Sequence, residues 1–159
     1  MATHPLEVDA FALCAREYCA WCIADKSKLS PGRYQFEATS NLAKVYAAFF
    51  TLPAAEFIEA PDVPRPSQTQ IQEVLAALGG LPFREYWEVF KPTQFEPGDP
   101  CVGDISDDFL DTYIDLAEGL WLYDDGHVQA AVWQWRFSFG IHWGRHATSA
   151  LRALQGFEA

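Results

Sequence analysis

Two histidines four residues apart, His142 and His146, are the side chains of this sequence best placed for chemistry. If their segment is a helix, both imidazoles lie on one face and can reach a single metal ion. Further ligands would come from other predicted helices, which offer the carboxylates of Glu17, Asp111, Asp115 and Glu118. The pair lacks the glutamate of the zinc-protease motif, so that chemistry is not indicated. The spacing is equally typical of structural histidines that hydrogen-bond to carboxylates or carbonyls.

The histidines lie in a segment dense in large aromatic and basic side chains, residues 133–147. As a helix, this segment would be buried over most of its circumference, and its rings would form a dry wall beside the imidazoles. Arg136 or Arg145 could hold an anion there. The predicted pocket consists of Trp135, Phe139, His142, Trp143, Arg145 and His146.

Acidic residues are concentrated in one region of the chain. The net charge is −11, and ten of the 22 acids lie between Pro92 and Asp125, where there is no Lys or Arg. A field of this sign repels phosphate backbones, so we expect no direct binding of nucleic acid. It favours a partner protein with a basic or mixed surface, or divalent cations. The predicted partner-binding face consists of Asp108, Asp111, Asp115 and Glu118, although such a row is commonly a solvated helix face.

The four cysteines do not form a convincing redox or metal motif. Cys19 and Cys22 have redox-motif spacing, but they fall inside a predicted helix without the surrounding pattern of a thioredoxin-like fold. We expect buried, unreactive thiols. The sequence shows no signal peptide and no apolar run that could span a membrane, so a cytoplasmic protein with reduced cysteines and no membrane contact is expected.

Helical periodicity of the apolar residues runs through most of the chain. It predicts helices over residues 6–24, 35–52, 67–78, 83–90, 106–123 and 127–154. The last would be about 42 Å long and antiparallel to its predecessor, because only a short turn separates them. The expected fold is an all-α, single-domain bundle of five to six helices over residues 1–159, with a long, buried C-terminal helix.

Three motifs in the C-terminal third carry a family resemblance. They are the acidic helix from Asp107 to Leu116, the aromatic run from Trp133 to Phe139, and the segment His142-Trp-Gly-Arg-His-Ala-Thr-Ser-Ala-Leu151. Together they resemble an uncharacterised bacterial family of helical proteins known as a domain of unknown function. The resemblance implies a small, helical, cytoplasmic bacterial protein and carries no activity with it.

Two functional hypotheses follow. The first, which we favour, is a non-enzymatic binding or regulatory module that contacts a partner protein through the acidic helical face and needs no cofactor. The second is a metal- or small-ligand-binding helical protein, possibly an enzyme, in which His142 and His146 hold one divalent transition metal or a ligand. The charge block supports the first hypothesis, and the histidine spacing supports the second. The oligomeric state is left open by the sequence.

Overall fold

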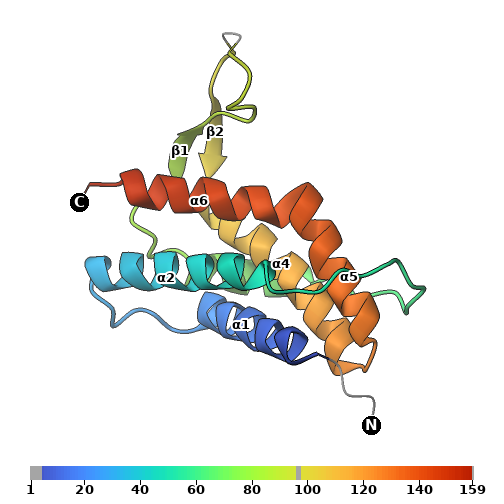
Figure 1. The fold of residues 1–159 in the computed structure, drawn as a ribbon. Coiled ribbons are helices and arrows are strands. Elements are labelled where there is room, and N and C mark those ends of the chain that lie inside the picture. The colour runs from blue at the N-terminus through green and yellow to red at the C-terminus, as the bar shows by residue number, and fades with distance from the viewer. Residues whose placement is uncertain (1–4, 96–97, 159) are drawn as a thin grey trace.

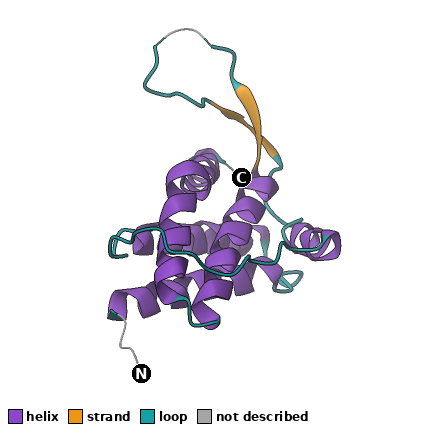
Figure 2. Ribbon diagram, turned by 90° about the vertical axis from the view of Figure 1, so that its right-hand side faces the viewer, coloured by secondary structure: helices purple, strands orange, loops and turns teal. Residues whose placement is uncertain are grey.

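The computed structural model describes residues 5–95 and 98–158, and its architecture is a bundle of helices from which a β-hairpin projects (Figures 1 and 2). The elements in chain order are α1 (Leu6–Ile23), α2 (Pro31–Phe49), α3 (Gln68–Ala77), β1 (Glu85–Glu88), β2 (Cys101–Asp104), α4 (Ile105–Asp124), α5 (Val128–Ser138), the π-helical turn η1 (Phe139–Trp143) and α6 (Gly144–Gly156). The all-α bundle is therefore confirmed. No helix in the described ranges is long and apolar enough to cross a membrane.

Local capping explains where the helices begin. Ser67 and Gln70 form a capping box at the start of α3. The second helix starts earlier than expected, because Ser30 caps it and the fixed φ of Pro31 suits a first helical position. Asp104 caps α4 by accepting from the first backbone amides, so this helix begins one residue earlier than predicted.

The core that fixes α4 against the C-terminal helix is built around Trp135. Its side chain is 0% exposed, and its indole Nε1 donates to the Leu116 carbonyl at 3.2 Å. Gly119 leaves the space for this ring, since a Cβ at that position would lie 2.0 Å from Nε1. Phe11 of α1 packs edge-on against the ring, with centroids 4.8 Å apart. This close contact sets the distance between α4 and the helix that carries the histidines.

The prediction of a fourth helix over residues 83–90 is wrong, because the middle of this segment forms strand β1. It pairs antiparallel with β2, and Tyr86 lies opposite Gly103. A Cβ at 103 would lie 2.5 Å from the Tyr86 ring, so glycine is what allows the two strands to pair with the ring between them. The Arg84–Asp104 ion pair, at 2.9 Å, closes the base of the hairpin. The hairpin therefore depends on contacts between distant residues.

The long C-terminal helix is confirmed as a continuous run of helical turns, but it is not uniformly α-helical. The five residues of η1 separate α5 from α6, and the helix changes direction there (Figure 1). A π-turn of this kind is a recognised cause of helix bending and is frequently found at functional sites. Here it carries His142.

Candidate metal centre

The candidate site lies between one face of α4 and the turn from η1 into α6. Asp108, Asp111 and Asp115 follow one another at three- and four-residue spacing, so α4 presents all three carboxylates on one side. The π-turn and the first turn of α6 bring His142 and His146 opposite them, with the two rings 4.7 Å apart. The site is thus assembled from two helices that the Trp135 packing holds together.

Each histidine uses Nδ1 to bond a carboxylate of α4. Nδ1 of His142 lies 2.8 Å from Asp115 Oδ2, and Nδ1 of His146 lies 2.7 Å from Asp108 Oδ1. A carboxylate only accepts hydrogen bonds, so we assign the ring proton to Nδ1 in both residues. In the neutral imidazole, Nε2 then carries a free lone pair.

Both Nε2 atoms face the same third carboxylate. The Oδ2 atom of Asp111 lies 3.8 Å from Nε2 of His142 and 3.5 Å from Nε2 of His146. One ligand atom from each of these residues lies within 4.8 Å of the other two. Donors bound about 2.1 Å from one ion at tetrahedral angles lie about 3.4 Å apart, so small side-chain movements would bring these three donors within bonding distance of one ion.

The carboxylates behind the histidines are buried. Asp108 is 5% exposed and Asp115 is 8% exposed. Burial raises the pKa of both carboxyls, and the hydrogen bonds from the histidines oppose that shift. The bond to Asp108 raises the pKa of His146. The Nδ1 bonds therefore hold both imidazoles in place, and the raised pKa of His146 favours a proton on its Nε2, which a metal ion would have to displace.

Tyr86 connects the hairpin to this site. Its hydroxyl donates to Oδ2 of Asp108 at 2.5 Å, while the other oxygen of Asp108 holds His146. Burial and the Asp108 carboxylate raise the pKa of Tyr86, so the phenol keeps its proton and remains a donor. Sequence reasoning did not include Tyr86, because its segment was expected to be a helix and no local pattern paired it with Asp108.

Several predicted pocket residues lie elsewhere. Trp135 and Trp143 are 0% exposed and belong to the core, so the prediction that they line a pocket is wrong. Phe139 stacks on Phe49 with ring centroids 3.6 Å apart, which directs it away from the histidines. The rings of these three aromatic residues fill the space between helices, where their burial is most favourable. Of the predicted set, His142, His146 and Arg145 remain close to the site.

Two further candidates are engaged elsewhere. Glu17 forms an ion pair with Lys44, so it is not a ligand of the histidine site. Arg136 donates to the Leu52 carbonyl at 3.0 Å and lies over the Phe49 ring. The anion-binding role proposed for Arg136 is therefore not supported, and Arg145 is the arginine that remains.

The acidic row does not form the solvent-facing surface that was expected. Asp108 and Asp115 are buried because the histidines of the adjacent helix pack over them, and Glu118 accepts from Gln134 at 2.9 Å. Asp111 keeps partial exposure, with 32% of its side chain accessible. A contact between these residues and a partner protein stays a prediction, but its premise of an open acidic face is wrong for the two buried carboxylates.

The cysteines are free thiols in different environments. Cys22 is buried, and burial raises its pKa to about 12; burial also raises the pKa of Cys19. Cys101, in contrast, is exposed on β2. The prediction of buried thiols is confirmed for Cys22 and wrong for Cys101.

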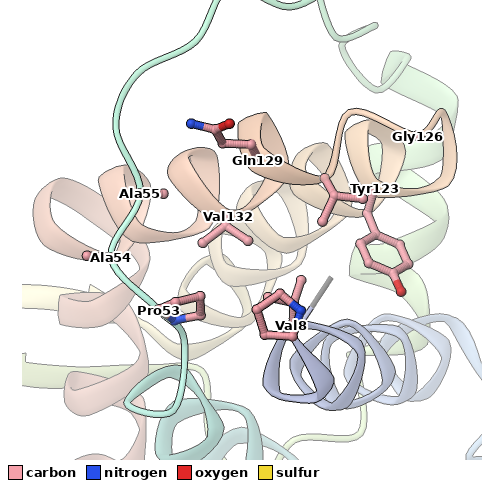
Figure 3. A pocket seen from close by; sticks show the side chains of 10 residues that line it. Val8, Pro53, Ala54, Ala55, Tyr123, Gly126, Gln129 and Val132 are labelled. Carbon is pink, nitrogen blue, oxygen red and sulfur yellow. The ribbon is translucent and has the colours of Figure 1, made fainter. Parts of the chain in front are cut away.

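A separate cavity lies far from the histidines, where the start of α1, the loop after α2 and the start of α5 meet (Figure 3). Its volume is about 680 Å³, and its lining is mainly apolar, with Val8, Pro53 and Val132 among the side chains. Tyr123 is part of this lining, and its hydroxyl donates to Asp9. Among the described residues of this lining, no carboxylate, imidazole or thiol is present beside the Tyr123 phenol, so the histidine cluster is the stronger candidate.

Comparisons with known proteins agree with the fold and leave the chemistry open. The chain is similar to the crystal structure of protein BF1032 from Bacteroides fragilis, with a TM-score of 0.77 and 18% sequence identity over 96% of this chain and 94% of that one. At this level of identity the likeness shows the fold alone. No curated protein matches the chain. The family model of a domain of unknown function, DUF5063, matches residues 3–159, and the chain therefore belongs to that family.

Proposed function

We propose that this protein binds one divalent transition metal ion through Asp111, His142 and His146. The observation that carries the proposal is the pair of Nδ1–carboxylate bonds, which leaves both Nε2 atoms aimed at one carboxylate. Three acceptor atoms that face one another repel unless a cation lies among them. Either protons or a metal ion can supply that charge, and the choice between them is open to experiment.

The surroundings of the three ligands support a metal ion. Histidines that bind metals usually donate their second ring nitrogen to a carboxylate, which fixes the ring and makes the ligating nitrogen more basic. Asp108 and Asp115 occupy that position here, one for each imidazole. Purely structural histidines would face Asp111 in this way only if both rings were protonated and donated from Nε2 as well.

The ligand set favours particular ions. Two imidazoles and one carboxylate suit zinc, iron(II), cobalt(II) and manganese(II), whereas calcium and magnesium prefer oxygen ligands alone. Three protein ligands leave coordination positions for water or a small ligand. The side chains are 32% to 42% exposed, so such a position would be reachable from solvent. A metal held in this way would polarise a bound oxygen or lower the pKa of a bound water.

This proposal takes the place of the acidic face as our first functional hypothesis. The carboxylates of Asp108 and Asp115 are committed to the histidines and are buried. The negative charge of this segment has a direct use if it surrounds a cation. A partner protein remains an independent prediction that requires Asp111 or Glu118 to be contacted from outside.

The test is metal binding by the untagged full chain, stripped with a chelator and dialysed. Zn²⁺ and Co²⁺ are titrated by calorimetry, and stoichiometry is checked by native mass spectrometry. We expect one ion per chain in the wild type, and a loss of affinity of at least about 100-fold in His142→Ala, His146→Ala and Asp111→Asn. His127→Ala is the matched control, because His127 is partly exposed and pairs with Asp125 in the turn before α5.

Two results would overturn the proposal. One is the absence of saturable binding at about 1 mM metal while the circular dichroism spectrum shows an intact helical fold, which would mean that protons hold the cluster together. The other is equal stoichiometry and affinity in wild type and in all three site variants, which would place the metal elsewhere. If an alanine variant loses helicity, Asp111→Asn still tests the proposal, because asparagine keeps the shape of the side chain and removes only its charge.

A further inference from the structure

The proposed metal site lies at one end of a groove between α6 and the hairpin. At this end, the groove has a volume of about 320 Å³ and includes His146 and Arg145 in its lining. It continues past Thr148 and Ser149 to Arg152, through a second hollow that shares several of the same residues. The groove therefore follows α6 for about two turns, or about 10 Å, from Arg145 to Arg152.

The two walls of the groove differ in chemistry. The α6 wall is polar and basic, with Arg145 and Arg152 at its ends and two hydroxyls between them. The hairpin wall is apolar and is formed by Val89, Phe90 and Pro92. Val89 and Phe90 are 64% and 62% exposed, although burial would be favourable for both. Such a groove fits a small molecule that has one apolar part and one charged part.

The charge in this groove is unusual for such an acidic protein. Arg145 donates to the Ile141 carbonyl at 2.8 Å, and neither Arg145 nor Arg152 has a carboxylate partner within the part of the chain that the structure describes. Both guanidinium groups thus keep donors for a ligand, and guanidinium matches carboxylate and phosphate oxygens. Among the described residues that line the groove, the acid is Glu88, which accepts a hydrogen bond from the Ser149 hydroxyl in the middle of the groove. Glu88 repels an anion there and leaves the two ends as the favourable positions.

We infer that this groove binds a small organic oxyanion, a carboxylate or a phosphate ester with an apolar substituent, whose charged group lies beside Arg145 and His146. The apolar substituent packs against Val89, Phe90 and Pro92. The inference rests on the proposed function, since an anion at this end is also attracted by a cation bound to His146. An inorganic oxyanion would contact only the basic wall, and a purely apolar molecule only the apolar wall, so both should bind more weakly.

The test uses four probes on the zinc-loaded full chain: phenylacetate, phenyl phosphate, inorganic phosphate and benzyl alcohol. Binding is followed by calorimetry and by chemical shifts of backbone amides on α6 and β1. We expect at least one of the two aromatic anions to bind at least about 10-fold more tightly than phosphate or the alcohol. The better aromatic probe identifies whether the site prefers a carboxylate or a phosphate ester.

Variants assign the binding to the groove. Arg145→Gln should weaken binding of the better anion about 10-fold while zinc affinity, measured first and separately, stays within about twofold. Phe90→Ser should weaken the aromatic anions without affecting inorganic phosphate. Arg33→Gln is the control, because Arg33 lies on α2 and pairs with Glu37.

The outcomes separate the two ideas. Zinc binding without shifts on α6 and β1, equal binding of the neutral alcohol, or unchanged affinity in Arg145→Gln overturns the inference and leaves the metal site intact. Absence of zinc binding in the wild type overturns the proposed function and this inference with it.

Discussion

The Tyr86 hydroxyl donates to Asp108 at 2.5 Å, so a strand of the projecting hairpin helps to hold the carboxylate that orients His146. The chain of contacts runs from β1 through α4 to α6. It makes the hairpin part of the candidate site, although the ligands themselves lie on helices.

We predict that Tyr86→Phe weakens metal binding by about 10-fold without changing the number of ions bound. Without the hydroxyl, Asp108 loses one of its hydrogen-bond donors, so its carboxylate is held less firmly and orients the imidazole of His146 less well. Calorimetric titration with Zn²⁺ measures the effect. Tyr46→Phe on α2 serves as the control and should leave the affinity unchanged. An equal loss of affinity in both variants would contradict a role for Tyr86 in holding Asp108 against His146.

Asp115→Asn should weaken metal binding by about 10- to 100-fold. The amide is close in shape to the carboxylate, but it lacks the charge that makes His142 a better ligand. The measurement is the dissociation constant for Co²⁺, together with the absorption spectrum of the bound ion. Asp125→Asn, in the turn before α5, is the matched control. Unchanged affinity in Asp115→Asn would mean that His142 does not need this partner.

Gly119→Ala should destabilise the fold by about 1–3 kcal/mol, because the new methyl group collides with the buried Trp135 ring. Gly32→Ala, in the exposed first turn of α2, has nothing within 4 Å of the added Cβ and should be neutral or stabilising by up to about 1 kcal/mol. Urea unfolding of the two variants checks the contrast. Equal stabilities would mean that the helices move apart at little cost.

Thiol labelling should distinguish Cys101 from the cysteines of α1. Burial raises the pKa of Cys22 to about 12, so at pH 8 it is a neutral, inaccessible thiol. Cys101 is exposed and should react first. Mass spectrometry of the folded protein after brief treatment with iodoacetamide should therefore find one fast-labelled site, and Cys101→Ser should remove it. Rapid labelling of Cys22 without denaturant would contradict the described packing.

The sequence predicted those parts of the fold that follow from local periodicity. The predicted ends of α1 and α3 lie within one residue of those in the structure. The two histidines and the aspartates of α4 were also identified as groups with possible chemistry. Whether these groups meet depends on how α4 packs on the C-terminal helix, which a periodic pattern cannot specify. The acidic row was therefore read as an open surface, although Asp108 and Asp115 are covered by the histidines.

The hairpin and the π-turn were missed for different reasons. Strands β1 and β2 contain four residues each, which is too short for an alternating pattern, and their pairing joins residues that are distant in the chain. The π-turn does not interrupt the helical periodicity, because Phe139, Ile141 and Trp143 continue the apolar pattern of the neighbouring helices. Both features contribute directly to the position of His146.

The π-turn also sets the angular phase of α6. A turn with i→i+5 bonding contains one residue more than an α-helical turn, so everything after it is rotated by about 100° compared with an uninterrupted helix. If the same residues closed as an ordinary α-helical turn instead, with no residue deleted, the extra residue would no longer be absorbed there. The face that now holds His146 against Asp108 would then be exchanged for another, while α5 kept its place. One residue thus determines which side of the last helix meets α4.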